Sequence, residues 1–150
     1  MTLREGRAYF LSDAFFDAYP SERFPEIEAK RNRPYVFYVV ELSKGVWFAI
    51  PLRSNVKHPF VFRTSANGGL DYSKAVPILD DSYVDTVHRA YVRPAEYPLI
   101  RKNRGAIKDG LRAYIEQYRE ARKHPRRTRN ARLIQYSTLQ YFEEELGLKA

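Results

Sequence analysis

The sequence contains no cysteine, so it can form neither a disulfide nor a thiolate metal site. Its three histidines lie far apart, and neither an HExxH motif nor a cluster of carboxylates accompanies them, so no metal site or other cofactor is expected. No apolar run approaches the roughly 20 residues that cross a membrane, and the first residues lack the apolar segment of a signal peptide. We therefore expect a cytoplasmic protein with no membrane partner.

Positive charge and aromatic side chains are abundant instead. Lysine and arginine number 26 against 18 acidic residues, which gives a formal net charge of +8. Aromatic residues make up 15% of the chain, with 12 tyrosines. A basic, tyrosine-rich chain favours a polyanionic partner, either nucleic acid or an anionic membrane surface. The 150 residues, of which 44% are hydrophobic, predict a single domain over residues 1–150 with its own core.

The hydrophobic pattern predicts an α+β fold. Residues 35–42 are β-branched and aromatic almost without interruption, which indicates a central strand buried on both faces. Ser43, Lys44 and Gly45 predict a turn into a hairpin partner at 46–50. Shorter strands are expected at 9–11, 60–64, 74–79 and 91–92, and helices after Ser12 or Asp13, from 107 to 121, and from 137 to 146. The layout is a compact antiparallel sheet with helices before and after it.

The most informative segment follows the predicted strand at 46–50. Arg53, Ser54, Lys57 and His58 lie within six residues of one another, and polar loops at strand ends are common places for catalytic groups. RNA cleaves itself when a base removes the 2′-hydroxyl proton, a cation stabilises the phosphorus centre and an acid protonates the leaving 5′-oxygen. The four residues supply these groups without a metal ion, so they are the predicted catalytic residues of an RNA-cleaving enzyme.

The role of His58 has two interpretations. It is the only histidine in the candidate site and so an obvious base, but Pro59 restricts its backbone to extended conformations, as expected of a structural residue leading into the next strand. If His58 is not the base, Lys57 is an alternative, because repulsion from Arg53 or Lys74 would lower the pKa of its amine. The lysines could equally serve only as electrostatic stabilisers.

Several further residues are expected to bind RNA. A second polar cluster, residues 71–74, follows a glycine pair, and the run from 119 to 132 is the densest positive charge in the chain. Such a run binds phosphates without reading sequence, although a solvated helix end and loop would look the same. The predicted RNA contacts are Arg33, Tyr35, Tyr72, Ser73, Lys74, Arg122, Lys123, Arg126, Arg127 and Arg129. Pairing of the central hairpin predicts that Arg33 and Arg53 lie at the same end of the sheet.

Four stretches of the sequence resemble a known family. They are Ala8-Tyr9-Phe10-Leu11-Ser12, Asn32-Arg33-Pro34-Tyr35 leading into a strand that ends at Glu41, Trp47-Phe48-Ala49-Ile50-Pro51-Leu52-Arg53-Ser54, and Gly69-Leu70-Asp71-Tyr72-Ser73-Lys74-Ala75. Together they resemble the toxins of type III toxin–antitoxin systems (the ToxN, AbiQ and TenpN group), and the last stretch is most similar to the TenpN branch. The similarity extends over nearly the whole chain.

The resemblance implies a strongly twisted antiparallel sheet flanked by helices and related to the Kid/MazF toxin barrel. It implies a sequence-preferring endoribonuclease that leaves 2′,3′-cyclic phosphate ends and acts in abortive defence against phage. Such toxins are held inactive by repeats of a pseudoknotted antitoxin RNA, usually in a closed ring of alternating protein and RNA. The expected partners are therefore the antitoxin RNA and cellular or phage RNA substrates.

By position, the family's hydroxyl-containing motif corresponds to Arg53 and Ser54, its nearby lysine to Lys57, and the cation before the central strand to Arg33. The chain departs from ToxN-type members in two places, since Arg53 replaces a threonine and Arg33 a lysine. An arginine stays protonated, so Arg33 could stabilise charge but not act as a base. His58 is then a candidate for a part that another residue plays elsewhere in the family.

Two other functions fit the same sequence. One is a non-catalytic RNA-binding module whose aromatic rings stack on bases. The other is a charged adaptor that docks on an acidic protein. Only RNA would give a steep linear fall of log affinity with log salt concentration.

Overall fold

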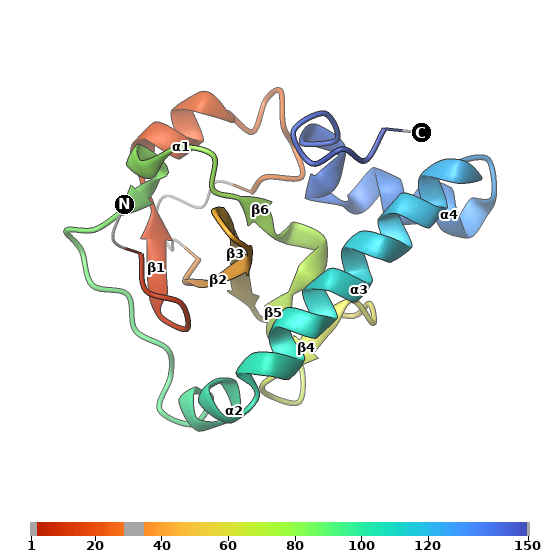
Figure 1. Ribbon diagram of the computed structural model, residues 1–150. Coiled ribbons are helices and arrows are strands. Elements are labelled where there is room, and N and C mark those ends of the chain that lie inside the picture. The colour runs from red at the N-terminus through yellow and green to blue at the C-terminus, as the bar shows by residue number, and fades with distance from the viewer. Residues whose placement is uncertain (1–2, 29–34, 150) are drawn as a thin grey trace.

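The computed structural model describes residues 3–28 and 35–149, and in these ranges the chain is α+β with one antiparallel sheet (Figure 1). The strands are β1 (Ala8–Leu11), β2 (Phe37–Ser43), β3 (Val46–Arg53), β4 (Val61–Arg63), β5 (Gly69–Asp71), β6 (Val76–Pro77) and β7 (Val84–Asp85). The α-helices are α1 (Asp13–Ala18), α2 (Tyr97–Lys102), α3 (Arg104–Lys123) and α4 (Thr128–Tyr136). Short 3₁₀ turns cover Tyr72–Lys74, Asp81–Tyr83 and Thr138–Tyr141.

The β2–β3 hairpin is the centre of the sheet, as the sequence predicts. Phe37 pairs with Pro51, and the Leu52 N–H donates to the Val36 carbonyl at 2.8 Å. The order β4-β5-β3-β2-β1-β7 has β4 and β7 at its ends, with β6 paired to the middle of β3. Within the described residues the sheet is therefore open and not closed into a barrel.

Both faces of the sheet are covered, which explains the continuous apolar run of β2. Tyr38 and Val40 pack with α2 and α3 in one core cluster, whereas Phe37 and Val39 pack with α1 in the other. Helix α3 buries one stripe on the first face, formed by Ile107, Leu111, Tyr114, Ile115 and Tyr118. Figure 1 shows α3 crossing in front of β5, with α1 at the upper left, on the other side of β2 and β3.

Two predicted elements are wrong. Residues 91–92 form no strand, because they have no pairing partner among the described residues, and the short strand lies instead at β7. The last long helix does not begin at Ser137. It is α4, which starts at Thr128 inside the basic run, while Ser137 accepts the N–H of Leu139 and caps a 3₁₀ turn. None of the helices in the described ranges has the length and apolar character needed to cross a bilayer.

Candidate functional site

The two polar segments singled out in the sequence converge at one edge of the sheet. Strand β5 pairs with the end of β3, with Leu52 opposite Leu70 and Arg53 opposite Gly69. This register places the loop after β3 beside the 3₁₀ turn after β5. Gly69 permits the close packing, because a Cβ atom there would lie 2.0 Å from the Phe62 carbonyl oxygen of β4.

Asp71 is the centre of the convergence, and we call the group of Arg53, His58, Asp71 and Ser73 the Asp71 junction. The Asp71 side chain has no exposed area. It accepts hydrogen bonds from Arg53 Nη1 at 2.7 Å, from the Ser73 N–H at 2.9 Å and from Ser73 Oγ at 2.6 Å, and His58 Nε2 lies 3.3 Å from its Oδ2. A buried carboxylate with this many donors is fully satisfied.

The electrostatics keep Asp71 ionised. Burial acts to raise the pKa of the Asp71 carboxyl, but the hydrogen bonds from His58, Ser73 and Arg53 outweigh it, so the pKa lies below its ordinary value. Burial likewise acts to lower the pKa of Arg53, and its hydrogen bonds to Asp71 and Tyr35 together with the charge of Glu28 raise it instead. The junction therefore holds a buried ion pair.

The geometry of His58 favours its structural interpretation. The Phe60 N–H donates to His58 Nδ1 at 3.0 Å, so a neutral ring carries its proton on Nε2, where Asp71 lies. Both ring nitrogens are thus engaged within the protein. Ser73 Oγ lies 3.2 Å from the same Nε2 and donates its proton to Asp71. A Ser-His-Asp triad needs serine and aspartate on opposite ring nitrogens, so the junction is not one.

The loop between Arg53 and His58 is fixed at both of its ends by Asp71. In between, Asn55 adopts a left-handed conformation with φ of 56°, which asparagine tolerates better than most residues. Val56 is buried, and its N–H donates to the Asn67 carbonyl at 2.8 Å. Ser54 and Lys57 are exposed. A hydroxyl and an ammonium group are therefore presented to solvent by a well-anchored loop.

Two glutamates that the sequence analysis missed neutralise cations of the site. Glu28 Oε2 lies 3.1 Å from Arg53 Nη2, and Glu26 accepts from Lys74 Nζ at 2.5 Å. Lys74 also donates to the Tyr136 carbonyl at 2.8 Å, and only 13% of its side chain is exposed. Sequence separations of 25 and 48 residues leave no local signal for these pairs. Lys74 is therefore an internal ion-pair partner and not a free surface cation.

Tyr35 and Tyr72 have internal partners in the fold. The Tyr35 hydroxyl donates to Glu28 at 2.9 Å, and its ring centroid lies 5.5 Å from the Arg53 guanidinium carbon. Tyr72 is only 6% exposed, and its hydroxyl donates to the Ile107 carbonyl at 2.9 Å. Tyr72 and the equally buried Ser73 are thus not available to RNA on the surface, contrary to expectation, because the turn after β5 points both side chains inward.

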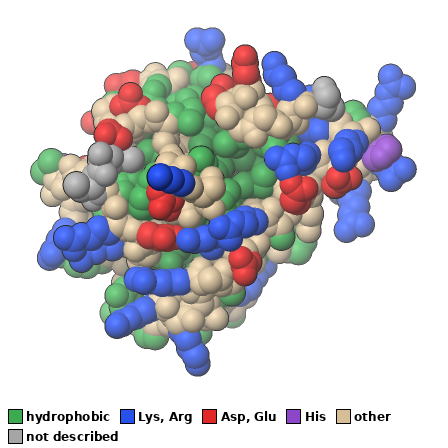
Figure 2. Space-filling view, viewed as in Figure 1, with side chains coloured by type: hydrophobic (Ala, Val, Ile, Leu, Met, Phe, Trp, Pro, Cys, Tyr) green, Lys and Arg blue, Asp and Glu red, His purple; other side chains and the backbone are tan. Residues whose placement is uncertain are grey.

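The predicted RNA-binding run divides into paired and unpaired residues. Arg122 Nε lies 2.9 Å from Glu143 Oε2, and Lys123 donates to Glu120 at 2.8 Å. Arg126, Arg127, Arg129 and Arg132 are exposed and have no ion-pair partner among the described residues, whereas Lys123 is exposed but paired. Figure 2 shows blue side chains around the purple histidine where α3 and α4 meet. Arg33 lies outside the described residues.

Comparison with models of protein families, with curated proteins and with solved structures gave no match. Within residues 3–28 and 35–149, no group of three or more histidine, cysteine, aspartate or glutamate side chains is arranged to hold a metal ion. The site is therefore interpreted from its own geometry, which is that of a buried carboxylate anchoring an exposed polar loop.

Proposed function

We propose that this protein is a metal-independent, sequence-preferring endoribonuclease toxin of the type III toxin–antitoxin group. The observation that carries the proposal is the anchored loop, on which the exposed Ser54 and Lys57 lie between two residues bound to one buried carboxylate. The formal net charge of +8 fits an RNA substrate. The sequence resemblance to ToxN, AbiQ and TenpN toxins leads to the same reaction.

In the proposed reaction the 2′-oxygen of the substrate attacks the adjacent phosphorus and the bond from phosphorus to the 5′-oxygen breaks. The 2′-hydroxyl gives its proton to the side chain that acts as base and the 5′-oxygen takes one from solvent water, which leaves a 2′,3′-cyclic phosphate and a 5′-hydroxyl. Lys57 stabilises the charge on the phosphoryl oxygens, and Ser54 donates a hydrogen bond to one of them. Arg53 and His58 hold the loop in place, and we assign them positioning roles.

Lys57 is also the proposed proton acceptor, because both nitrogens of His58 are engaged by Phe60 and Asp71. Its neutral amine takes the 2′-hydroxyl proton, and the ammonium group that results stabilises the phosphoryl charge. The pH profile of cleavage separates the two residues. A histidine base gives a rate that rises through about pH 6.5, whereas a lysine base gives a rise at higher pH. If the cleavage rate of the wild type rises with pH near about 6.5 and His58→Gln loses this rise, His58 is the base.

The proposal includes regulation by RNA. Repeats of a pseudoknotted antitoxin RNA bind the toxin, assemble with it into a closed protein–RNA ring, and release it during phage infection. The open sheet of this chain would then be a relative of the Kid/MazF barrel. This part rests on the sequence resemblance and is tested by co-expression of the protein with short tandem-repeat RNA encoded upstream of its gene.

The direct test is incubation of the purified protein with end-labelled RNA in excess EDTA. We expect fragments with 2′,3′-cyclic phosphate ends, which are diesters and therefore resist a phosphomonoesterase until acid opens the ring. Lys57→Ala and Ser54→Ala should each lower the cleavage rate by about 10²–10³-fold. The matched control is Lys44→Ala, which removes an exposed lysine in the turn between β2 and β3 and should leave the rate unchanged.

Two results of the same assay would contradict the proposed function. RNA that is retained but stays intact would identify a non-catalytic RNA-binding module. Equal cleavage by wild type, Lys57→Ala and Ser54→Ala would rule out the anchored loop as the catalytic site.

A further inference from the structure

A pocket of about 540 Å³ lies at the opposite edge of the sheet from the Asp71 junction. The junction belongs to the edge formed by β3, β5 and β4, whereas the pocket lies beside β1 and β7, beyond β2. Its walls come from the residues around β1, from the segment after β7, and from α2 and the start of α3. The volume is within the usual range of ligand sites.

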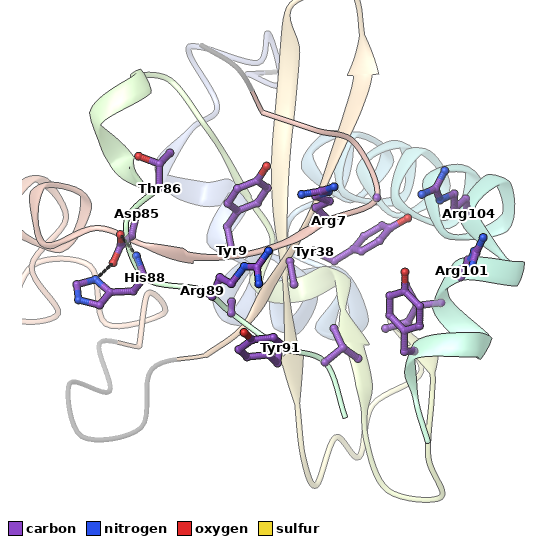
Figure 3. Close-up of a pocket in the computed structure, with 16 residues that line it drawn as sticks. Arg7, Tyr9, Tyr38, Asp85, Thr86, His88, Arg89, Tyr91, Arg101 and Arg104 are labelled. Atoms are coloured by element: carbon purple, nitrogen blue, oxygen red, sulfur yellow. Dashed lines mark hydrogen bonds and ion pairs between the residues drawn. The ribbon is translucent and has the colours of Figure 1, made fainter. Parts of the chain in front are cut away.

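Four arginines from separate segments line this pocket, and we call it the arginine pocket. They are Arg7, Arg89, Arg101 and Arg104. Figure 3 shows Arg7 and Arg89 on one side of the opening and Arg101 and Arg104 on the helices across from them. All four side chains are exposed, so the pocket opens to solvent.

None of these arginines has an ion-pair partner in the part of the chain that the structure describes. This differs from Arg53, Arg112, Arg119 and Arg122, each of which pairs with a carboxylate. The carboxylate in the pocket wall, Asp85, binds the His88 ring at 2.8 Å and accepts the backbone N–H groups of Val87 and His88. Four uncompensated positive charges therefore converge on one hollow, and a bound polyanion would relieve their repulsion.

The rest of the lining identifies the kind of anion. Tyr9 and Tyr38 stand on the strands, and Tyr91 and Tyr97 stand on the other walls. Tyr91 is 72% exposed and Tyr97 is 49% exposed, although rings of this size are usually covered. Exposed aromatic rings interleaved with arginines suit single-stranded nucleic acid, whose bases stack on the rings while its phosphates bind the guanidinium groups.

The backbone also permits a guanidinium group at the rim. Gly6 has φ of +83°, and a Cβ atom there would lie 2.7 Å from Arg104 Nη2. The absence of a side chain thus lets the Arg104 head group lie against the chain just before β1. Arg104 is thereby placed at the rim of the pocket near Tyr38, as Figure 3 shows.

We propose that the arginine pocket binds a short single-stranded segment of RNA, with phosphates on the arginines and bases stacked on Tyr91 and Tyr97. The proposal rests on the proposed function in that it takes RNA as the partner of the chain. It adds a second contact region, at the edge of the sheet away from the anchored loop. RNA held there is bound but not cleaved.

The test is binding of a fluorescently labelled single-stranded RNA oligonucleotide, measured by anisotropy over a range of salt concentrations. The variants are Arg89→Ala with Arg101→Ala, and Tyr91→Ala. The double arginine variant should weaken binding and reduce the slope of log affinity against log salt by about 1.4, since each phosphate contact on a single strand contributes about 0.7. Tyr91→Ala should weaken binding by at least about fivefold with little change in slope.

Arg23→Ala is the matched control, because Arg23 is an exposed arginine outside the pocket, and it should bind as wild type does. Cleavage of a dinucleotide, which is too short to reach both edges of the sheet, should proceed equally in all these variants. If wild type binds and cleaves RNA while the pocket variants keep its affinity and salt slope, the pocket proposal is overturned and the proposed function stands. If wild type binds RNA through the pocket but cleaves neither substrate, the pocket proposal stands and the proposed function fails.

Discussion

Replacement of Asp71 by asparagine tests the Asp71 junction most directly. The amide keeps the shape of the side chain but removes the charge that faces Arg53 and His58. Removal of one partner from a buried ion pair costs about 3–5 kcal/mol. Arg53 retains Glu28 and is 19% exposed, so we expect the free energy of unfolding to fall by about 2–4 kcal/mol. For a chain of this size the melting temperature should drop by about 5–15 °C.

The assay is urea unfolding followed by circular dichroism and by the fluorescence of Trp47, the single tryptophan. The matched control is Asp109→Asn, whose side chain is 79% exposed beside Arg112 and which should change stability by less than about 0.5 kcal/mol. If Asp71→Asn is as stable as Asp109→Asn, the reasoning about the junction is refuted.

We also expect Asp71→Asn to change how the stability of the folded protein depends on acid pH. The pKa of Asp71 is lowered in the folded protein, so its contribution to stability is fully present above the ordinary aspartate pKa. That contribution is lost as the pH falls from there through the lower folded pKa, because the proton binds the unfolded chain more tightly. Wild type should therefore lose stability over this interval, and Asp71→Asn should lose less. Unfolding curves at several pH values below about 5 measure the difference.

Three further variants or measurements address neighbouring features. Gly110→Ala would place a Cβ atom 2.2 Å from the Tyr72 hydroxyl oxygen and should destabilise the protein by about 1–3 kcal/mol. The control is Gly105→Ala on the same helix, whose Cβ atom would meet nothing within 4 Å and which should be neutral or stabilising by up to about 1 kcal/mol. Equal melting temperatures for the two variants would contradict this packing. Tyr72→Phe should cost about 1 kcal/mol through the lost hydrogen bond to Ile107, and a melt identical to wild type would show that this bond contributes nothing. The ¹H–¹⁵N spectrum of the His58 ring at about pH 8, where an ordinary imidazole is neutral, should show the proton on Nε2, and a proton on Nδ1 would contradict the bond from Phe60.

The central hairpin could be predicted because its signals are local. The run of β2 is apolar on both faces, the turn contains Gly45 in a positive-φ conformation, and β3 follows at once. The second polar segment could be recognised after its glycine pair, but the three-residue strand β5 that places it beside the end of β3 was not predicted. The pairing of the two segments through Asp71 could not be predicted either, because an aspartate in a turn has the same local pattern whether it is solvated or buried.

The wrong predictions for helix α4 and Tyr72 also arose because tertiary contacts, which the local sequence does not show, decide their structure. Helix α4 is rich in arginine, which is a good helix former, yet the density of charge after Pro125 suggested a loop. Its apolar residues Leu133 and Ile134 pack against the core beside α3, and this tertiary contact stabilises the helix. Tyr72 shows the ambiguity of tyrosine, since its apolar ring and polar tip suit a core as well as an RNA surface.

The pairing of Glu26 with Lys74 and of Glu28 with Arg53 has a consequence for how a nucleic acid would be attracted. Arg53 and Lys74 are matched there by Glu26, Glu28 and Asp71, so these two cations give the corner no free positive charge. Long-range attraction must then originate on the exposed Lys57, on Arg63, whose guanidinium group donates to the His58 carbonyl at 3.3 Å, and on the unpaired arginines of other surfaces. Added salt should consequently weaken capture of the polymer while leaving the architecture of this corner intact.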